Sequence, residues 1–270
     1  MAFAIVVACL FLAGLVLFQG KLLFGRTTRI RRAKPGPAAG RRKAERVVLD
    51  RPGDVKLEGW LTTSDTVPQH LLIWFGGRNE NVAWTPDLAG WLPDDCALLA
   101  FNYRSLGRST GWPSERACVA DALAIAAWGL AELTLPASAL SLAGRSIGSG
   151  VAIQLAARLV QEDREPAKLT LITPPKSLRA LIEAHALLRP LAPLLRSPFD
   201  SMRAAVALQC PVLMLLAEQD GQVPHAHSMD LAQALRAAGS AVEVKTLAGT
   251  HHRNLVRAPE AMGLLGRWLA

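Results

Sequence analysis

A serine between two glycines is the residue of this chain whose type and surroundings point most directly to chemistry. The segment GRSIG at residues 144–148 follows an apolar, strand-like run and opens a helix-like run. The glycines let the chain turn tightly from strand to helix, which leaves the hydroxyl of Ser146 exposed above a sheet. The helix N-terminus offers backbone N–H groups to a developing oxyanion. We expect Ser146 to be a nucleophile; a Gly- and Ser-rich turn without chemistry is the alternative.

The groups that would activate Ser146 should lie downstream in the chain. A serine hydroxyl needs a general base, and the base needs a carboxylate that orients it. With a serine at such a turn, the acid and then the histidine follow in chain order. Asp220 ends an apolar run in a Gly-containing turn and is favoured over Glu218, which lies closer to the strand. His251 and His252 both follow the next strand-like run, and spacing alone leaves the choice open.

Two backbone N–H groups would complete this site by stabilising the oxyanion. Ile147, the residue after the nucleophile, should supply one of them. The second should come from the Gly-rich loop that follows the run LLIWF, at Arg78. A plain Gly-Gly turn is the alternative for this loop.

Neither a metal site nor a disulfide framework is expected. His225 and His227 lie near Asp220, but no cluster of cysteines or acids accompanies them. The four cysteines show no paired spacing and are expected to be buried, reduced thiols: Cys9, Cys96, Cys118 and Cys210.

Alternating strands and helices must position these residues. Eight segments are predicted strands: 46–50, 56–62, 70–75, 97–102, 139–143, 168–172, 212–217 and 242–246. Several are continuous apolar runs, typical of strands buried on both faces of a parallel sheet. Four segments are predicted helices: 113–133, 148–162, 228–238 and 258–269. This order predicts a mostly parallel, doubly wound α/β sheet, with antiparallel pairing of the first two strands because no helix separates them.

The charge is concentrated in an N-terminal tail. Residues 1–46 hold ten of the 30 Lys and Arg and one of the 22 acids, which leaves 20 basic and 21 acidic residues in the rest. A nearly neutral domain argues against a nucleic-acid-binding face, whereas a basic tail suits a membrane surface. With 51% hydrophobic residues, the chain can bury a sizeable core.

The first residues of the chain read as a membrane anchor. Residues 2–18 carry no charged side chain, and about 17–25 apolar residues can span a bilayer. A cleaved signal peptide is the alternative, but its basic residues would precede the apolar run, whereas here they follow it. The positive-inside rule then places the rest of the chain in the cytoplasm. We expect a single-pass anchor at 1–24, a basic Pro/Gly linker at 25–45 and a catalytic domain at 46–270.

A helical-looking, apolar stretch lies between the sixth and seventh predicted strands. Residues 176–209 could form a small cap over the site, or they could be an ordinary crossover. In a cap, Leu181, Leu187 and Leu188 would favour recognition of an acyl chain.

Several motifs together resemble the single-pass, membrane-anchored branch of the α/β-hydrolase-domain serine hydrolases. Residues 103–115 (YRSLGRSTGWPSE) look like that group's loop after the fourth strand, and residues 144–150 are similar to its nucleophile elbow. Residues 210–225 match its acid segment. In the last motif, the spacing across residues 249–255 selects His252 as the catalytic histidine.

This resemblance implies an α/β-hydrolase fold and the hydrolysis of esters or thioesters without a cofactor. Some members of the group act on lipidated proteins at the cytoplasmic membrane face. Two positions depart from its pattern: Gly76-Gly77-Arg78 stands where His-Gly-Asn is usual, and Ser105 replaces a Gly.

Two alternatives to ester or thioester hydrolysis remain. Acyl transfer or peptide cleavage would pass through the same acyl-enzyme, so the sequence does not separate them from hydrolysis. A catalytically silent scaffold is a third possibility, supported only by the altered oxyanion segment.

Overall fold

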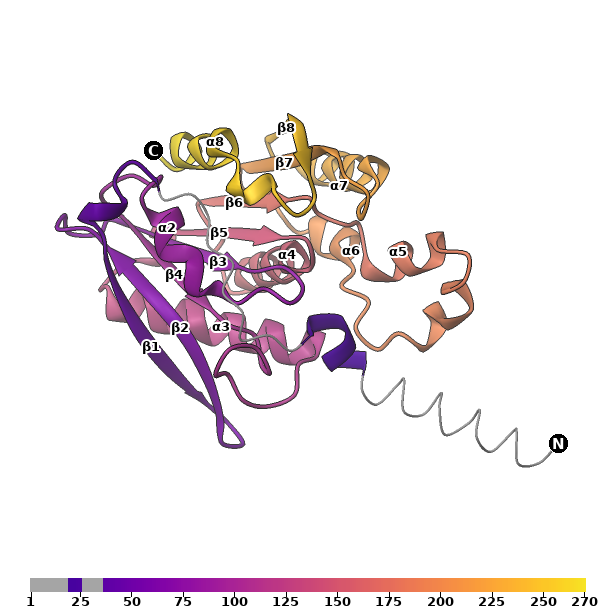
Figure 1. Ribbon diagram of the computed structural model, residues 1–270, viewed down its shortest axis with the longest axis horizontal. Coiled ribbons are helices and arrows are strands. Elements are labelled where there is room, and N and C mark those ends of the chain that lie inside the picture. Colours follow the sequence, from indigo (N-terminus) through magenta and orange to yellow (C-terminus); the bar gives the residue numbers. More distant parts are fainter. Residues whose placement is uncertain (1–18, 26–35) are drawn as a thin grey trace.

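A single eight-stranded sheet runs through the part of the chain that the computed structural model describes, residues 19–25 and 36–270 (Figure 1). Its order is β1-β2-β4-β3-β5-β6-β7-β8. The strands are β1 (Lys43–Arg51), β2 (Val55–Thr63), β3 (His70–Phe75), β4 (Cys96–Phe101), β5 (Leu140–Arg145), β6 (Lys168–Ile172), β7 (Val212–Gln219) and β8 (Val242–His251). The pairs β1–β2 and β2–β4 are antiparallel, and all other neighbours are parallel.

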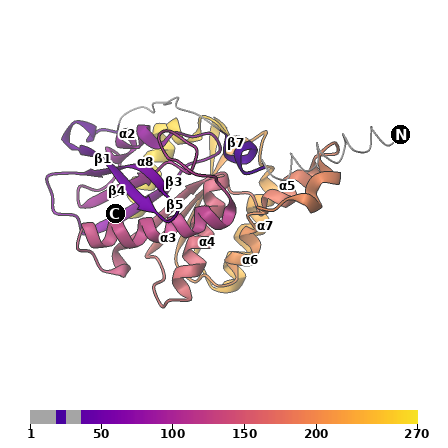
Figure 2. The same cartoon turned by 90° about the horizontal axis from the view of Figure 1, so that it is seen from below.

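Helices cover both faces of this sheet. Helices α3, α4, α6 and α7 lie on one face, and α2 and α8 lie on the other (Figure 2). Their bounds are α2 (Thr85–Ala89), α3 (Glu115–Glu132), α4 (Ile147–Val160), α5 (Leu178–Ala184), α6 (Ser201–Ala205), α7 (His225–Ala238) and α8 (Pro259–Leu269). Short 3₁₀ turns are η1 (Ala39–Arg41), η2 (Val82–Trp84), η3 (Ala137–Ala139), η4 (Arg189–Leu194) and η5 (Leu255–Arg257).

The central strands are apolar on both sides because both sides are buried. In β3, Leu71, Ile73 and Phe75 join the core beneath α3 and α4. Leu72 and Trp74, which point the other way, join the core beneath α2 and α8. Successive side chains of a strand alternate between faces, so a continuous apolar run fills two cores at once. This confirms the prediction drawn from the apolar runs.

All eight predicted strands and all four predicted helices are present. The antiparallel pairing of the first two strands is confirmed. Helix α2 was not predicted, because five residues are too few to show a helical period. The predicted strand at residue 46 begins three residues earlier, at Lys43.

The segment predicted as a linker is partly built into the domain, so the boundary at residue 46 is corrected. The backbone N–H of Gly36 donates to Asp87 O at 3.0 Å. The guanidinium of Arg42, only 1% exposed, donates to Leu92 O at 2.6 Å and to Cys96 O at 3.1 Å. Burial lowers the pKa of Arg42, which nearby Asp94 opposes. This arginine is thus a buried structural residue and does not belong to a free basic tail.

The predicted membrane anchor falls mainly on residues outside the described part. None of the described helices is long and apolar enough to span a membrane. Residues 19–24, the end of the predicted 1–24 span, are helical and lie against the domain. Phe24 is fully buried there.

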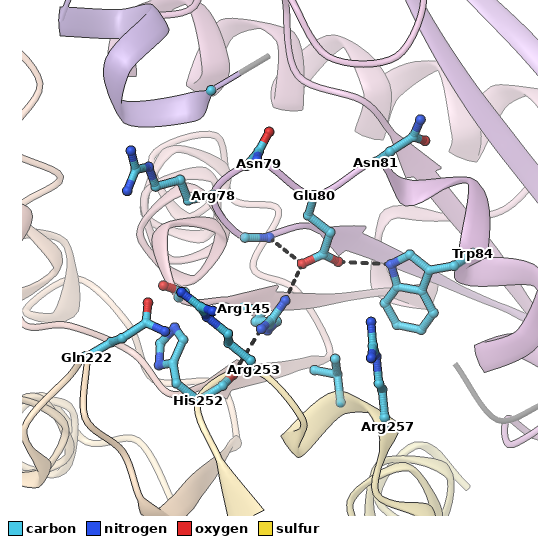
Figure 3. Close-up of a pocket in the computed structure, with 14 residues that line it drawn as sticks. Arg78, Asn79, Glu80, Asn81, Trp84, Arg145, Gln222, His252, Arg253 and Arg257 are labelled. Carbon is cyan, nitrogen blue, oxygen red and sulfur yellow. Dashed lines mark hydrogen bonds and ion pairs between the residues drawn. The ribbon is translucent and has the colours of Figure 1, made fainter. Parts of the chain in front are cut away.

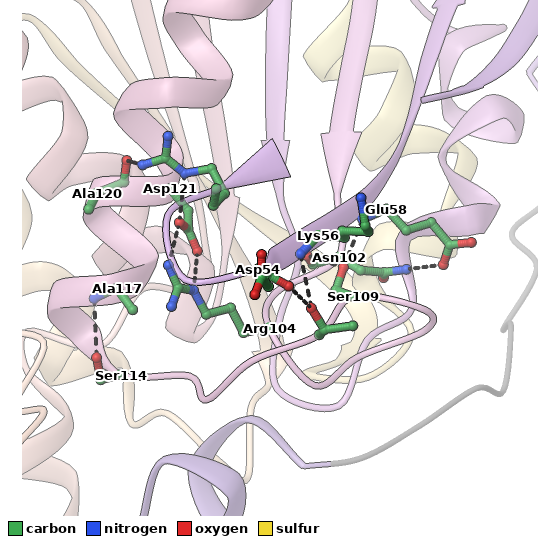
Figure 4. Close-up of polar contacts among 12 residues, drawn as sticks. Asp54, Lys56, Glu58, Asn102, Arg104, Ser109, Ser114, Ala117, Ala120 and Asp121 are labelled. Carbon is green, nitrogen blue, oxygen red and sulfur yellow. Dashed lines mark hydrogen bonds and ion pairs between the residues drawn. The ribbon is translucent and has the colours of Figure 1, made fainter. Parts of the chain in front are cut away.

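Buried charges fix the loop that follows β4 (Figure 4). The carboxylate of Asp121 on α3, 7% exposed, accepts from Arg104 at 2.7 and 2.9 Å. It also accepts from Arg51 at 3.1 Å. A buried carboxylate must be paired with positive charge. Asp121 is paired with two arginines, and these ion pairs link α3 to the loop through Arg104 and to β1 through Arg51.

The same loop reaches the end of β3, where the site begins. Tyr103 Oη donates to Gly76 O at 3.0 Å. Ser105 has φ 67°, a left-handed conformation that favours glycine. Ser105 therefore stands in a strained conformation at a position where the resemblance expects Gly. Its Oγ donates to Gly25 O at 3.4 Å.

Candidate active site

Ser146 lies at a strained turn between β5 and α4. Its backbone has φ 54° and ψ −119°, which is unfavourable for a residue with a side chain. A Cβ on Gly148 would overlap the carbonyl oxygen of Phe75, and one on Gly144 would overlap that of Gly148. The two glycines therefore allow helix and strands to approach closely, and this contact holds Ser146 at the carboxyl edge of the sheet.

Asp220 and His252 meet at this same edge. Asp220 follows β7 and His252 follows β8, and the carboxyl ends of parallel strands lie at one edge of a sheet. His252 Nδ1 lies 2.8 Å from one carboxylate oxygen of Asp220 and 3.0 Å from the other. Both side chains are buried, at 7% and 2% exposure. A bond at Nδ1 leaves Nε2 available for a proton.

The competing residues do not take these places. His251 is exposed, and its backbone N–H donates to Asn254 Oδ1 at 2.6 Å. Glu218 is exposed and accepts from Gly249 N at 2.9 Å. Among the described residues, the predicted acid and the histidine selected by the motif register are the two that pair.

The pKa of Asp220 lies below its ordinary value. Burial acts to raise it, but the hydrogen bond with His252 and those from the backbone N–H groups of Val223 and Gln222 outweigh burial. The two backbone donors lie 2.8 and 2.9 Å from Asp220 Oδ1. Because these bonds favour the ionised form, Asp220 is held as a carboxylate facing the imidazole.

A cavity of about 310 Å³ opens at Ser146 and His252 (Figure 3). It is lined by Gly25, Gly77, Arg78, Asn79, Glu80, Asn81, Trp84, Arg145, Ser146, Gln222, His252, Arg253, Val256 and Arg257. The lining holds four guanidinium groups and one carboxylate. Arg253 and Arg257 form no ion pair with any other residue of the described chain. The cavity is therefore positively charged beside the serine.

One ion pair behind the cavity was not foreseen from the sequence. Arg145 Nη1 lies 2.6 Å from Glu80 Oε2, with both side chains largely buried. Glu80 also accepts from Gly77 N at 2.9 Å and from Trp84 Nε1 at 3.1 Å. Arg145 Nη2 donates to His252 O at 2.9 Å. Arg145 occupies the variable position of the Gly-x-Ser-x-Gly motif, so no spacing rule marked it.

The predicted oxyanion donors belong to the loop after β3 and to the start of α4. Arg78 lines the cavity, and its backbone N–H has no hydrogen-bond partner within the described chain. Ile147 is the first residue of α4, where backbone N–H groups have no intrahelical acceptor. Both backbone N–H groups are thus without an acceptor in the described chain, and their role as oxyanion donors stays a prediction.

The cap leucines do not contribute to this cavity. In residues 176–209, α5, η4 and α6 connect β6 to β7, and α5 and η4 lie to one side of the sheet (Figure 1). Leu187 is 84% exposed, and neither it nor Leu181 or Leu188 lines the cavity. The prediction that these leucines recognise an acyl chain at the serine is not supported.

The other potentially reactive groups lie apart from the cavity. Cys96, Cys118 and Cys210 are free and buried, while Cys9 lies outside the described residues. Burial raises the pKa of Cys96 and of Cys210 to about 12, so both stay as thiols at neutral pH. Within the described ranges, no group of three His, Cys, Asp or Glu side chains is placed to hold a metal ion.

The lowered pKa of Asp220 predicts a pH-dependent contribution to stability. A lowered folded-state pKa stabilises the fold above the ordinary carboxyl pKa, about 4, and this stability is lost as the pH falls through the folded value. The free energy of unfolding of wild type should therefore fall relative to that of Asp220→Asn as the pH is lowered below about 4. Urea unfolding of both proteins above and below this pH measures the difference, and a constant difference in unfolding free energy would contradict the assignment.

The chain is similar to several known sequences. A family model described as the dienelactone hydrolase family matches residues 169–262, about a third of the chain. An uncharacterized protein of Mycobacterium tuberculosis, Rv2307c, is 29% identical over 182 residues, which are 66% of this chain and 62% of the relative. Lysophosphatidylserine lipase ABHD12 of Danio rerio is 28% identical over 196 residues, 64% of this chain and 50% of the relative. The chain thus matches half to three-fifths of these relatives' length.

Solved structures resemble the whole domain. An alpha-beta hydrolase from Vibrio vulnificus superposes with a TM-score of 0.68 at 20% identity, covering 84% of this chain and 80% of its own. The Pyrococcus furiosus esterase Pf2001 gives 0.68 at 18% identity, covering 89% of this chain and 98% of its own. Together with the sheet order and the turn at Ser146, these similarities show that the chain has the α/β-hydrolase fold.

Proposed function

We propose that this protein is a serine hydrolase that cleaves carboxylic ester or thioester bonds through an acyl-enzyme on Ser146. The observation that carries the proposal is the pairing of His252 Nδ1 with Asp220 at 2.8 Å, on the same cavity as a serine held at a strained turn. An orienting acid, a base and an exposed hydroxyl are the groups that acyl transfer to serine requires.

In the first half of the reaction, His252 Nε2 accepts the Ser146 hydroxyl proton as Oγ bonds to the substrate carbonyl carbon. The carbonyl electrons move to its oxygen, which the backbone N–H groups of Arg78 and Ile147 stabilise. Collapse of this intermediate breaks the C–O or C–S bond, and His252 gives its proton to the departing alcohol or thiol. Asp220 holds the imidazole and stabilises its charged form throughout.

In the second half, water takes the place of the departed group. His252 accepts a proton from water as the water oxygen attacks the acyl carbon. The bond to Ser146 Oγ then breaks, the proton returns to the serine, and a carboxylic acid is released.

The activity is tested by labelling the full chain with a fluorophosphonate, which reacts only with an activated serine. Ser146→Ala should abolish labelling, and His252→Ala should slow it by about 10⁴-fold or more, because triad members act as a unit. His251→Ala is the matched control and should label like wild type. Folded wild type that does not label would leave the scaffold interpretation, and loss of labelling in His251→Ala alone would show that the wrong histidine has been assigned.

The charge of the cavity supports a substrate with an anionic group. Of the four arginines in the lining, Arg145 is neutralised by Glu80, whereas Arg253 and Arg257 are exposed and without an ion pair in the described chain. Guanidinium groups bind carboxylates and phosphates through paired hydrogen bonds. The relative named as a lysophosphatidylserine lipase acts, by that name, on a lipid of this charge. We therefore favour esters that carry an anionic group near the bond that is cleaved.

This preference can be measured on a matched pair of lysophospholipids, one with an anionic serine head group and one with a zwitterionic choline head group. Wild type should favour the anionic lipid in kcat/KM by about tenfold, equivalent to about 1.4 kcal/mol. The double variant Arg253→Gln/Arg257→Gln should remove most of this preference, and Arg267→Gln on α8 should retain it. Equal rates on both lipids in wild type would contradict the proposed selectivity.

We also propose that the residues before Gln19 anchor the enzyme in a membrane, with the catalytic domain in the cytoplasm. The support is the uncharged run at residues 2–18 and the basic residues that follow it. Full-length protein should stay in the membrane pellet after alkaline carbonate extraction. Val7→Arg/Leu12→Arg should release it, because each arginine costs about 2.5–3.5 kcal/mol at the centre of a span.

The matched control for this test is Val7→Ala/Leu12→Ala, which should remain in the membrane. Protease added outside intact cells should leave the catalytic domain uncut. Release of wild type by carbonate would contradict the anchor, and cleavage of the domain in intact cells would contradict its orientation.

A further inference from the structure

The helical residues 19–24 lie directly before a residue of the active-site wall. Gly25, the residue after them, lines the cavity that holds Ser146. Gln19 Oε1 accepts from Arg196 N at 2.7 Å, and Lys21 Nζ lies 3.6 Å from the centre of the Trp112 ring. The helix, indigo in Figure 1, therefore contacts both the loop after β4 and the segment between η4 and α6.

One aromatic side chain holds this short helix in place. Phe24 is fully buried and belongs to the larger of the two cores. Its ring packs edge-to-face on Tyr103, with 5.0 Å between centroids, and on Phe199, with 5.9 Å. Burial of this ring and its two edge-to-face contacts therefore hold residues 19–24 against the core.

The backbone of the same helix holds the loop that should form half of the oxyanion hole. Phe24 O accepts the N–H of Asn79 at 2.8 Å. Leu22 O accepts from the guanidinium of Arg78 at 3.0 Å. Asn79 has φ 55°, a left-handed conformation that asparagine adopts more readily than other non-glycine residues.

The backbone N–H groups before and after Arg78 are both hydrogen-bonded, whereas the N–H of Arg78 is not bonded to any described residue. On one side of Arg78, the Gly77 N–H donates to Glu80 Oε2 at 2.9 Å. On the other side, the Asn79 N–H donates to Phe24 O. The Arg78 N–H between them has no partner within the described chain. Fixing both neighbouring peptides fixes the direction of this N–H, which an oxyanion donor requires.

We infer that Phe24 is a positioning residue for the oxyanion hole, acting through its backbone bond to Asn79 to aim the N–H of Arg78. The inference rests on the proposed hydrolase function only for its effect on rate; the effect on the loop stands apart from it. Residues 19–24, next to the proposed anchor, thereby contribute to the activity of the site and not only to its stability.

The test uses the full chain in detergent and compares wild type with Phe24→Ala and Phe24→Leu. Loss of one oxyanion donor lowers kcat by about 10²–10³-fold, so a partly displaced loop in Phe24→Ala should lower kcat at least about tenfold. KM should change much less, because a donor to the oxyanion acts in the transition state. Phe24→Leu keeps a buried apolar side chain and should retain most of kcat.

Leu235→Ala on α7 is the matched control for lost packing. Leu235 is also fully buried, but it belongs to α7, none of whose residues lines the cavity. This variant should lower the melting temperature and leave kcat within about twofold, since a core cavity far from the site affects stability only. Unchanged kcat in Phe24→Ala, with a lowered melting temperature, would show that the helix is only structural.

Amide hydrogen exchange separates this inference from the proposed function. In Phe24→Ala the Asn79 amide should exchange about tenfold faster or more, while the Gly77 amide, held by Glu80, should keep its wild-type rate. If wild type neither labels nor hydrolyses esters, the hydrolase proposal fails, yet the exchange rates still decide the positioning role. Equal protection of Asn79 in wild type and Phe24→Ala would overturn it. If Phe24→Ala does not fold, Phe24→Val supports the same comparison.

Discussion

The buried pair of Glu80 and Arg145 joins the three loops on which the site depends. Glu80 holds the Gly77 amide of the loop after β3, and Arg145 lies beside Ser146 at the end of β5. Arg145 also holds the carbonyl of His252. A buried ion pair adds little net stability compared with apolar packing, but loss of one partner leaves the other charge uncompensated. Its role here is to set the relative positions of nucleophile, base and oxyanion loop.

Most of the sheet could be predicted from the sequence because its central strands are short and buried on both faces. Runs such as LLIWF in β3 and VLMLL in β7 have the length of a strand and lie between turn signals, which favours a strand over a buried helix. The order of the strands could not be predicted, since it depends on contacts between distant segments. The antiparallel pairing of β2 with β4 is one example, and the short helix α2 is another feature without a periodic signal.

Some residues of the site could be predicted from the sequence and others could not. Ser146, Asp220 and His252 each follow a predicted strand, so chain order and motif register were enough to propose them, and the structure brings Asp220 and His252 together. No sequence motif indicates Glu80 or Phe24, because each contacts residues that are distant in the sequence and become neighbours only in the folded chain. The basic segment before β1 shows a related limit. Charge counting assigned Arg42 to a solvated tail, whereas the structure buries it against three backbone carbonyls.

The docking of residues 19–24 joins parts of the chain that lie far apart in the sequence. Gln19 Nε2 donates to Leu194 O across 175 residues, and Phe24 O accepts the N–H of Asn79. Contacts between such distant segments form late in folding, because the loop between them must first be closed. A chain in which these contacts have not yet formed therefore lacks the support of the loop that carries Arg78, even when its sheet is in place.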